Sequence, residues 1–235
     1  MKKLRGFWAL CVFLFLLAGC NSDIPDTINE TQGESIVCLG DSLTAGYGAS
    51  TPGEDDKSKS YPAYLQEKVN IPVFNAGVSG DTTAQGLARV DSEVLSHNPQ
   101  IVIILLGAND LRALTPLQTT IDNLQRIIDK VNDGKRKIYF AKFYGEITEE
   151  KIIDLSNLLG ITNYAVLTEL ITQIDNAYNT LASENDVTLI EDIWQGIWGI
   201  HMSDLFHPDA AGYEIMADNI FNVLQPYLQE NDLLK

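Results

Sequence analysis

Short apolar runs recur along this chain, and their spacing constrains the fold more than any other feature. Five runs have the length of a strand, and they span residues 35–39, 72–75, 101–106, 137–143 and 187–190. A strand that is apolar along nearly its whole length is covered on both faces of its sheet, which is typical of parallel sheets. The runs therefore predict five parallel strands in an α/β protein.

The segments between these runs carry apolar residues at helical spacing. A helix is expected with Thr115 as its N-cap, Pro116 at its first position and Gly134 closing it. The last helix is expected to be disturbed near Pro226. Three further segments complete the helical set, and they span residues 82–96, 166–182 and 209–228. The β-α-β alternation predicts right-handed crossovers with helices on both faces of the sheet, which is a three-layer α/β/α architecture.

Three segments depart from this alternation. Residues 50–60 are polar and predict a loop, whereas residues 190–203 form an unusual aromatic loop. Residues 144–164 match no pattern that predicts a particular element or role. Loops carry much of the substrate choice in α/β enzymes, so these segments leave the specificity open.

The first twenty residues have the composition of a signal peptide. Three basic residues precede an apolar stretch at 7–18, which is shorter than an ordinary transmembrane helix. The sequence Leu17-Ala18-Gly19-Cys20 that follows is similar to a bacterial lipobox, in which the thiol of Cys20 would receive a diacylglycerol. A plain secretory signal that happens to end in cysteine is the alternative. Acyl chains on Cys20 would anchor the protein firmly, because each buried methylene contributes about 0.8 kcal/mol.

Three parts are expected along the chain. Residues 1–20 form the lipoprotein signal, the polar residues 21–34 form a flexible tether, and residues 35–235 form one domain that is long enough for a sizeable core. A lipidated Cys20 predicts an extracytoplasmic protein held at a bacterial membrane. An ordinary disordered terminus explains the composition of residues 21–34 equally well.

The chain is strongly acidic, with 16 basic and 32 acidic residues. The signal holds three of the basic residues and none of the acidic ones, so the mature net charge would change from −16 to −19. Such a surface argues against nucleic acid as a partner and against broad attachment to anionic lipid. Of the three cysteines only Cys38 belongs to the domain. It has no disulfide partner, and its place in the first apolar run predicts a buried small hydrophobe.

Residues with catalytic chemistry follow several of the predicted strands. They stand in four short segments, which are Gly-Asp-Ser-Leu at 40–43, Gly-Val-Ser-Gly-Asp at 77–81, Gly-Ala-Asn-Asp at 107–110 and Asp-Leu-Phe-His at 204–207. In open α/β sheets functional groups gather at the carboxyl ends of the strands. Segments far apart in the sequence can therefore converge on one edge of the sheet.

Ser42 is the candidate nucleophile, and His207 is its candidate base. A serine hydroxyl is inert at neutral pH unless a base accepts its proton during attack. Asp204 precedes His207 by three residues, a distance that a tight turn or one helical turn can close. Its carboxylate could hold the Nδ1 hydrogen and stabilise the imidazolium formed in the transition state. Taken singly, each segment has an ordinary structural explanation: a helix N-cap at Asp41-Ser42, and a surface turn at Asp204.

All four segments, in this order, resemble the blocks of the SGNH (GDSL) hydrolase family. The closest likeness is to its bacterial thioesterase, lysophospholipase and arylesterase branch, through residues 75–82 and the short block 204–207. The resemblance spans nearly the whole mature domain. It implies a flavodoxin-like fold and the hydrolysis of carboxylic esters and thioesters without metal or organic cofactor. It also implies a small-molecule or lipid ester as the partner at the site.

The resemblance assigns three oxyanion donors: the backbone N–H of Ser42, the backbone N–H of Gly80 and the side-chain amide of Asn109. Each donor fixed near the developing oxyanion is worth roughly 3 kcal/mol. A glycine suits close backbone approach, and an amide donates without adding charge. Asp81 is expected to cap the following helix, and Asp110 is expected to brace its loop rather than act as a catalytic acid.

The aromatic loop just before His207 is the candidate substrate wall. It carries Trp194 and Trp198 among several large apolar side chains. We interpret it as the wall of an acyl-chain pocket or as a lid, with simple core packing as the alternative.

Three other functions compete with the serine esterase. A carbohydrate O-acetyl esterase would use the same fold and residues, and a lipid-tethered solute-binding protein would use the same cleft without chemistry. A metal phosphoesterase would require His201, Asp204 and His207 as ligands, a set too thin to predict a metal site. His97, the remaining histidine, is expected on the surface.

Overall fold

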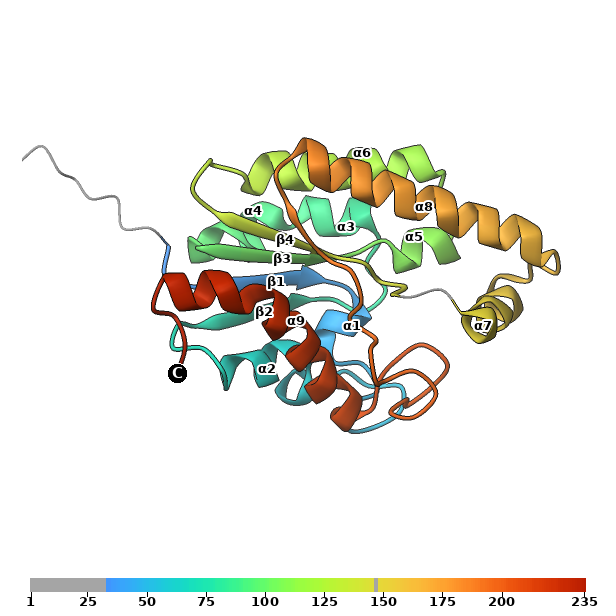
Figure 1. Ribbon diagram of the computed structural model, residues 1–235, viewed down its shortest axis with the longest axis horizontal. Coiled ribbons are helices and arrows are strands. Elements are labelled where there is room, and N and C mark those ends of the chain that lie inside the picture. The colour runs from blue at the N-terminus through green and yellow to red at the C-terminus, as the bar shows by residue number, and fades with distance from the viewer. Residues whose placement is uncertain (1–32, 146–147) are drawn as a thin grey trace, which may run out of the picture. The chain divides into compact units, whose positions relative to one another are not determined.

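The computed structural model describes residues 33–145 and 148–235 and contains one five-stranded parallel sheet (Figure 1). The strand order is β2-β1-β3-β4-β5. The strands are β1 Ile36–Gly40, β2 Val73–Gly77, β3 Ile101–Leu105, β4 Lys137–Ala141 and β5 Thr188–Ile190. The five predicted strands are therefore present, each within two residues of its expected limits. The predicted signal, Cys20 and residues 21–32 of the predicted tether lie outside the described residues.

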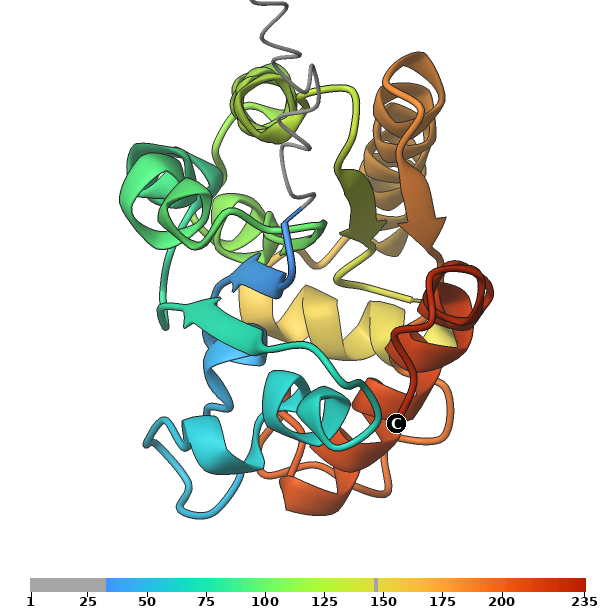
Figure 2. The same ribbon diagram turned by 90° about the vertical axis from the view of Figure 1, so that its left-hand side faces the viewer.

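Helices cover both faces of this sheet, as Figures 1 and 2 show from two directions. One face carries α2 (Tyr61–Gln66) and α9 (Ala210–Glu230), and the other carries α3 (Thr83–Ala88), α6 (Leu117–Val131) and α8 (Tyr164–Glu184). Every residue of β1 and β3 is buried, because these strands lie inside the sheet. The predicted three-layer α/β/α architecture is confirmed.

Several helix limits differ from those the sequence predicts. The single helix expected over 82–96 is broken into α3, α4 (Val90–Glu93) and a 3₁₀ turn at Leu95–His97, because the backbone leaves the helical conformation at Arg89. The helix expected to start at Pro116 starts one residue later, and Thr115 instead donates its amide hydrogen to the carbonyl oxygen of Asp110. Helix α9 continues through Pro226 to its end.

The segments without a predicted element are partly structured. Residues 144–164 contain α7 (Glu149–Leu159), and the polar loop contains a 3₁₀ turn at Lys57–Lys59. The aromatic loop consists of turns and bends between β5 and α9. Cys38 is buried as expected, and burial raises the pKa of its thiol to about 12. No helix within the described residues is long and apolar enough to cross a membrane.

Candidate active site

Three of the four candidate segments leave neighbouring strands at one level of the sheet. Gly40, the last residue of β1, is in register with Gly77 at the end of β2 and with Leu105 at the end of β3. Residues that follow these positions by two to four places therefore share one edge. From β1 the chain goes to its neighbour β2 on one side, and from β2 it crosses back to β3 on the other side of β1. The direction of the connections therefore reverses between β1 and β3. Ligand crevices form at such switch points in α/β sheets.

Ser42 begins the short helix α1 (Ser42–Ala45), where the Asp41 carboxylate caps the helix by accepting a hydrogen bond from the Leu43 amide at 3.1 Å. His207 reaches this serine from the loop between β5 and α9. Its Nε2 lies 2.9 Å from Ser42 Oγ, although 165 positions separate the two residues. The imidazole also packs against Tyr47, with ring centroids 4.4 Å apart.

A tight turn joins Asp204 to His207. Oδ1 of Asp204 accepts hydrogen bonds from the backbone amides of Phe206 and His207, each at 2.8 Å. The His207 Nδ1 lies 2.9 Å and 2.8 Å from the two carboxylate oxygens. Partial burial alone would raise the pKa of the Asp204 carboxyl, but these hydrogen bonds lower it overall. A carboxylate at Nδ1 favours the tautomer with hydrogen there, so Nε2 is left to accept from the Ser42 hydroxyl.

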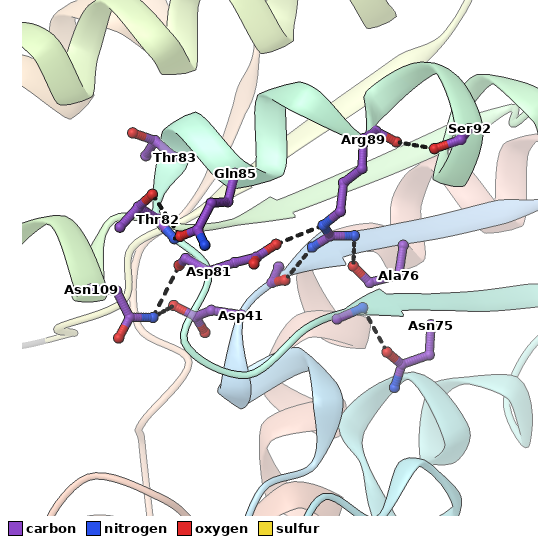
Figure 3. A network of polar contacts seen from close by, with 12 residues as sticks. Asp41, Asn75, Ala76, Asp81, Thr82, Thr83, Gln85, Arg89, Ser92 and Asn109 are labelled. Carbon is purple, nitrogen blue, oxygen red and sulfur yellow. Dashed lines mark hydrogen bonds and ion pairs between the residues drawn. The ribbon is translucent and has the colours of Figure 1, made fainter.

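Gly80 and Asn109 lie on the same cavity as Ser42. Gly80 has φ = 87°, a conformation that favours glycine, and within residues 33–145 and 148–235 its backbone amide donates no hydrogen bond. The Asn109 side chain stands in the first turn of α5 (Ala108–Arg112). Its Nδ2 donates to the carbonyl oxygen of Asp81 at 3.0 Å and to Oδ2 of Asp41 at 3.3 Å (Figure 3).

Comparison with known proteins matches this arrangement to one family. The GDSL-like lipase/acylhydrolase family matches residues 38–215, which include all the candidate residues of the cavity described so far. The chain belongs to this family. Membership and the named relatives make the protein a serine ester hydrolase, and the predicted family resemblance is confirmed.

Two curated relatives and one solved structure illustrate the similarity. The hydrolase is 28% identical to the esterase TesA of Pseudomonas aeruginosa over 225 residues, which cover 91% of this chain and 98% of the relative. It is 39% identical to thioesterase 1/protease 1/lysophospholipase L1 of Escherichia coli K12 over 216 residues, which cover 87% and 90% of the two chains. A crystal structure of TesA superposes with a TM-score of 0.64 at 25% identity, covering 82% of this chain and 98% of that one.

Arg89 ties the end of β1 to the turn that holds Gly80, a role that the sequence did not indicate. Its guanidinium donates to the Asp81 carboxylate at 2.6 Å, to the Ala76 carbonyl oxygen at 2.6 Å and to the Gly40 carbonyl oxygen at 2.8 Å (Figure 3). The predicted capping role of Asp81 is therefore wrong, because this carboxylate is committed to Arg89 while Thr82 caps α3. Buried charge pairs of this kind require such a complete set of hydrogen bonds.

Asp110 braces the Asn109 loop, as the sequence predicts. Its buried carboxylate accepts hydrogen bonds from the amide of Thr83 at 2.8 Å and from the hydroxyl of Thr83 at 2.6 Å. A third contact, at 3.4 Å, comes from the Thr120 hydroxyl. These contacts tie α5 to α3 and α6, so the position of Asn109 is fixed by the packing of three helices.

A cavity of about 510 Å³ opens beside Ser42 and His207. The apolar side chains that line it include Leu111, Phe143, Leu155, Trp194 and Trp198, which come from the connections after β3, β4 and β5. Trp194 and Trp198 meet edge to face, with ring centroids 5.2 Å apart. Both predicted pocket tryptophans thus line the same cavity as the candidate nucleophile. The Trp194 indole N–H donates to the Phe143 carbonyl oxygen at 2.8 Å, which fixes one side of this wall.

The three residues weighed as metal ligands do not form a cluster. The His207 imidazole faces Ser42, whereas His201 Nδ1 lies 3.9 Å from a carboxylate oxygen of Asp209. Among the described residues no group of three histidine, cysteine or acidic side chains could hold a metal ion. His97 is half-buried and stacks on Phe74, with ring centroids 3.8 Å apart.

Asp41 should make the stability of the hydrolase depend on pH. Burial raises the pKa of its carboxyl to about 7, against the opposing hydrogen bond from the Leu43 amide. A carboxyl with a raised pKa stabilises the folded state fully below its unfolded pKa, near 4, and loses this contribution as the pH rises through 7. We expect the unfolding free energy of the wild type, relative to Asp41→Asn, to fall by about 4 kcal/mol between pH 4 and pH 8.

Urea unfolding of both proteins at five pH values across this range measures that difference. Titrating groups far from Asp41 contribute equally to the two proteins and cancel. A difference that stays constant with pH would show that the Asp41 carboxyl titrates at an ordinary pKa.

Proposed function

We propose that this hydrolase cleaves carboxylic esters or thioesters through an acyl-enzyme on Ser42. The observation that carries the proposal is the contact of 2.9 Å between His207 Nε2 and Ser42 Oγ, with His207 Nδ1 held by Asp204. This is the geometry that a serine nucleophile, its general base and the orienting carboxylate require. The assignment of Ser42, His207 and Asp204 as a triad is our proposal.

The reaction follows from these contacts in two steps. In the first, Ser42 Oγ attacks the acyl carbonyl carbon as His207 Nε2 accepts the hydroxyl proton, and the imidazolium then protonates the leaving alcohol or thiol. In the second, His207 takes a proton from water, the hydroxide attacks the acyl-enzyme, and the proton returns to Ser42 Oγ as the acid leaves. Asp204 stays ionised and stabilises the imidazolium in both steps.

Negative charge develops on the former carbonyl oxygen in each step. We assign its stabilisation to the backbone amides of Ser42 and Gly80 and to the Asn109 side chain. The Gly80 amide supports this assignment, because within the described chain it has no competing acceptor. Donors that are fixed before the reaction cost no reorganisation when the charge appears.

The substrate proposal rests on the shape and lining of the cavity. Its wall of Trp194, Trp198 and Leu155 suits an acyl chain, because the apolar side chains of a pocket bury the apolar part of a ligand while a few polar groups fix its orientation. The names of the relatives, an esterase and a thioesterase/lysophospholipase, support the same class. An O-acetyl esterase acting on sugars is the second candidate of the same fold, and the apolar wall favours the longer acyl group.

The proposal for the N-terminal residues 1–34 concerns export and anchoring. We infer that residues 1–20 direct export, that Cys20 carries the lipid and that residues 21–34 connect it to the hydrolase domain at 35–235. The protein would then act outside the cytoplasm at a bacterial membrane. The support for this part is the lipobox-like sequence alone.

A fluorophosphonate probe tests the nucleophile directly. We expect covalent labelling of a single serine, located at Ser42 by peptide mass spectrometry, and complete loss of labelling in Ser42→Ala. Ser79 provides a matched control because its hydroxyl lines the same cavity but donates to the Asp55 carboxylate. Labelling that persists in Ser42→Ala and disappears in Ser79→Ala would overturn the assignment, and labelling of neither serine would favour a solute-binding protein.

A further inference from the structure

Cationic side chains line the active-site cavity, although the chain is strongly acidic. The whole chain has twice as many acidic as basic residues. Of the described residues, the cationic side chains of Arg112 and Lys151 and the carboxylate of Asp204 line the cavity beside Ser42. That carboxylate is committed to the imidazole of His207. Among the described residues that line the cavity, Arg112 thus stands out as an exposed cation in a chain that is strongly acidic.

Arg112 is the cation available to a ligand. It is exposed, and within residues 33–145 and 148–235 its guanidinium makes no hydrogen bond or ion pair. It follows Asn109 by three residues in α5, so both side chains stand on one face of this helix with Cβ atoms about 5–6 Å apart. A guanidinium on a long stem thus stands beside the amide that we assign to the oxyanion.

Lys151 adds a second positive charge from another element. It lies in α7, is 6% exposed and lines the cavity near Trp198, with Nζ 5.3 Å from the centre of a Trp198 ring. Lys151 therefore belongs to the part of the cavity lining that α7 supplies.

We propose that Arg112 is a specificity residue that binds an anionic group, a phosphate in particular, in the alcohol part of the ester. The proposal rests on the proposed function, because it places the scissile carbonyl at Ser42. The acyl part is assigned to the tryptophan wall, which comes from the β5 connection, whereas Arg112 comes from the β3 connection. The guanidinium fork binds phosphate oxygens with two parallel hydrogen bonds, an arrangement that lysine cannot reproduce.

The test compares two esters that differ only in the anionic group. 1-Hexanoylglycerol and 1-hexanoylglycerol 3-phosphate share the scissile ester, and their short acyl chain keeps them monomeric in solution. We expect the wild type to hydrolyse the phosphate ester with the higher kcat/KM. Arg112→Gln should lower the ratio of the two kcat/KM values by about 10–100-fold, mainly through KM, which corresponds to the strength of hydrogen bonds to a charged group.

Two variants and one condition separate this role from a general effect on the site. Arg112→Lys should restore part of the ratio, because it keeps the charge but loses the paired hydrogen bonds. Arg126→Gln removes an exposed arginine on α6 that does not line the cavity, and it should leave both activities unchanged. The preference of the wild type should also weaken at high ionic strength.

The outcomes distinguish this inference from the proposed function. A wild type that cleaves both esters with equal kcat/KM, or an Arg112→Gln variant with an unchanged ratio, would overturn the role of Arg112 and leave the esterase intact. Failure of the wild type to cleave either ester would count against the proposed function itself.

Discussion

Replacing His207 with alanine is expected to lower kcat/KM for a short p-nitrophenyl ester by about 10⁴–10⁶-fold. The imidazole is the proposed base, and its Nε2 lies 2.9 Å from Ser42 Oγ. Without a base to accept its proton, a serine hydroxyl is a poor nucleophile. The residual rate would come from the oxyanion donors and from substrate binding. Steady-state kinetics with enzyme at high concentration can measure a loss of this size.

Two comparisons make that result specific. His97→Ala removes a histidine that stacks on Phe74 and does not line the cavity, so its activity should remain close to that of the wild type. Adding Ser42→Ala to His207→Ala should cause little further loss, because residues that act as one unit are strongly non-additive. If the two losses multiplied, His207 and Ser42 would be acting independently, and the proposed acyl-enzyme mechanism would not hold.

Replacing Asn109 with alanine is expected to lower kcat by about 10²–10³-fold and to change KM little. The reason is that the amide is proposed to donate a hydrogen bond to the oxyanion, whose negative charge develops only in the transition state. The same amide donates to the Asp81 carbonyl oxygen and to Asp41, so some loss of thermal stability is expected too. Kinetics must therefore be measured well below the melting temperature of the variant.

Asn75 offers the matched control for this experiment (Figure 3). Its amide donates to the Thr44 carbonyl oxygen at 2.7 Å and to the Ser60 hydroxyl at 2.9 Å, and its side-chain oxygen accepts from the Gly77 amide at 2.9 Å. It does not line the cavity. Asn75→Ala should lower stability without a comparable fall in kcat. Equal effects of the two substitutions on kcat would reduce Asn109 to a structural role.

The fold is predictable because its signals are local. Apolar runs of strand length and helical spacing between them are properties of short stretches, and each is read without knowledge of the rest of the chain. The candidate residues also stand just after predicted strands, where an α/β sheet presents its functional groups. The helix expected over 82–96 is interrupted at Arg89, whose side chain donates to carbonyl groups near the ends of β2 and β1, and periodicity does not encode such contacts.

The connections between distant elements are what the sequence leaves undetermined. No pattern in the chain indicates that Arg89 donates to the Gly40 and Ala76 carbonyl groups, or that Arg112 and Lys151 line the cavity. Helix α7, within a segment that matched no pattern, supplies part of the cavity wall. Such contacts depend on crossing angles and loop paths, which are fixed only when the whole core packs.

The sequence by itself determined the parallel sheet, the family resemblance and the candidate residues, because strand periodicity and short motifs are written in neighbouring positions. Only the tertiary structure decided how close Ser42 and His207 lie, how Asp41 meets Asn109, and which side chains share their cavity. The physical reason is that a pair 165 positions apart is brought together by the register of five strands and the return of the chain from β5 to α9.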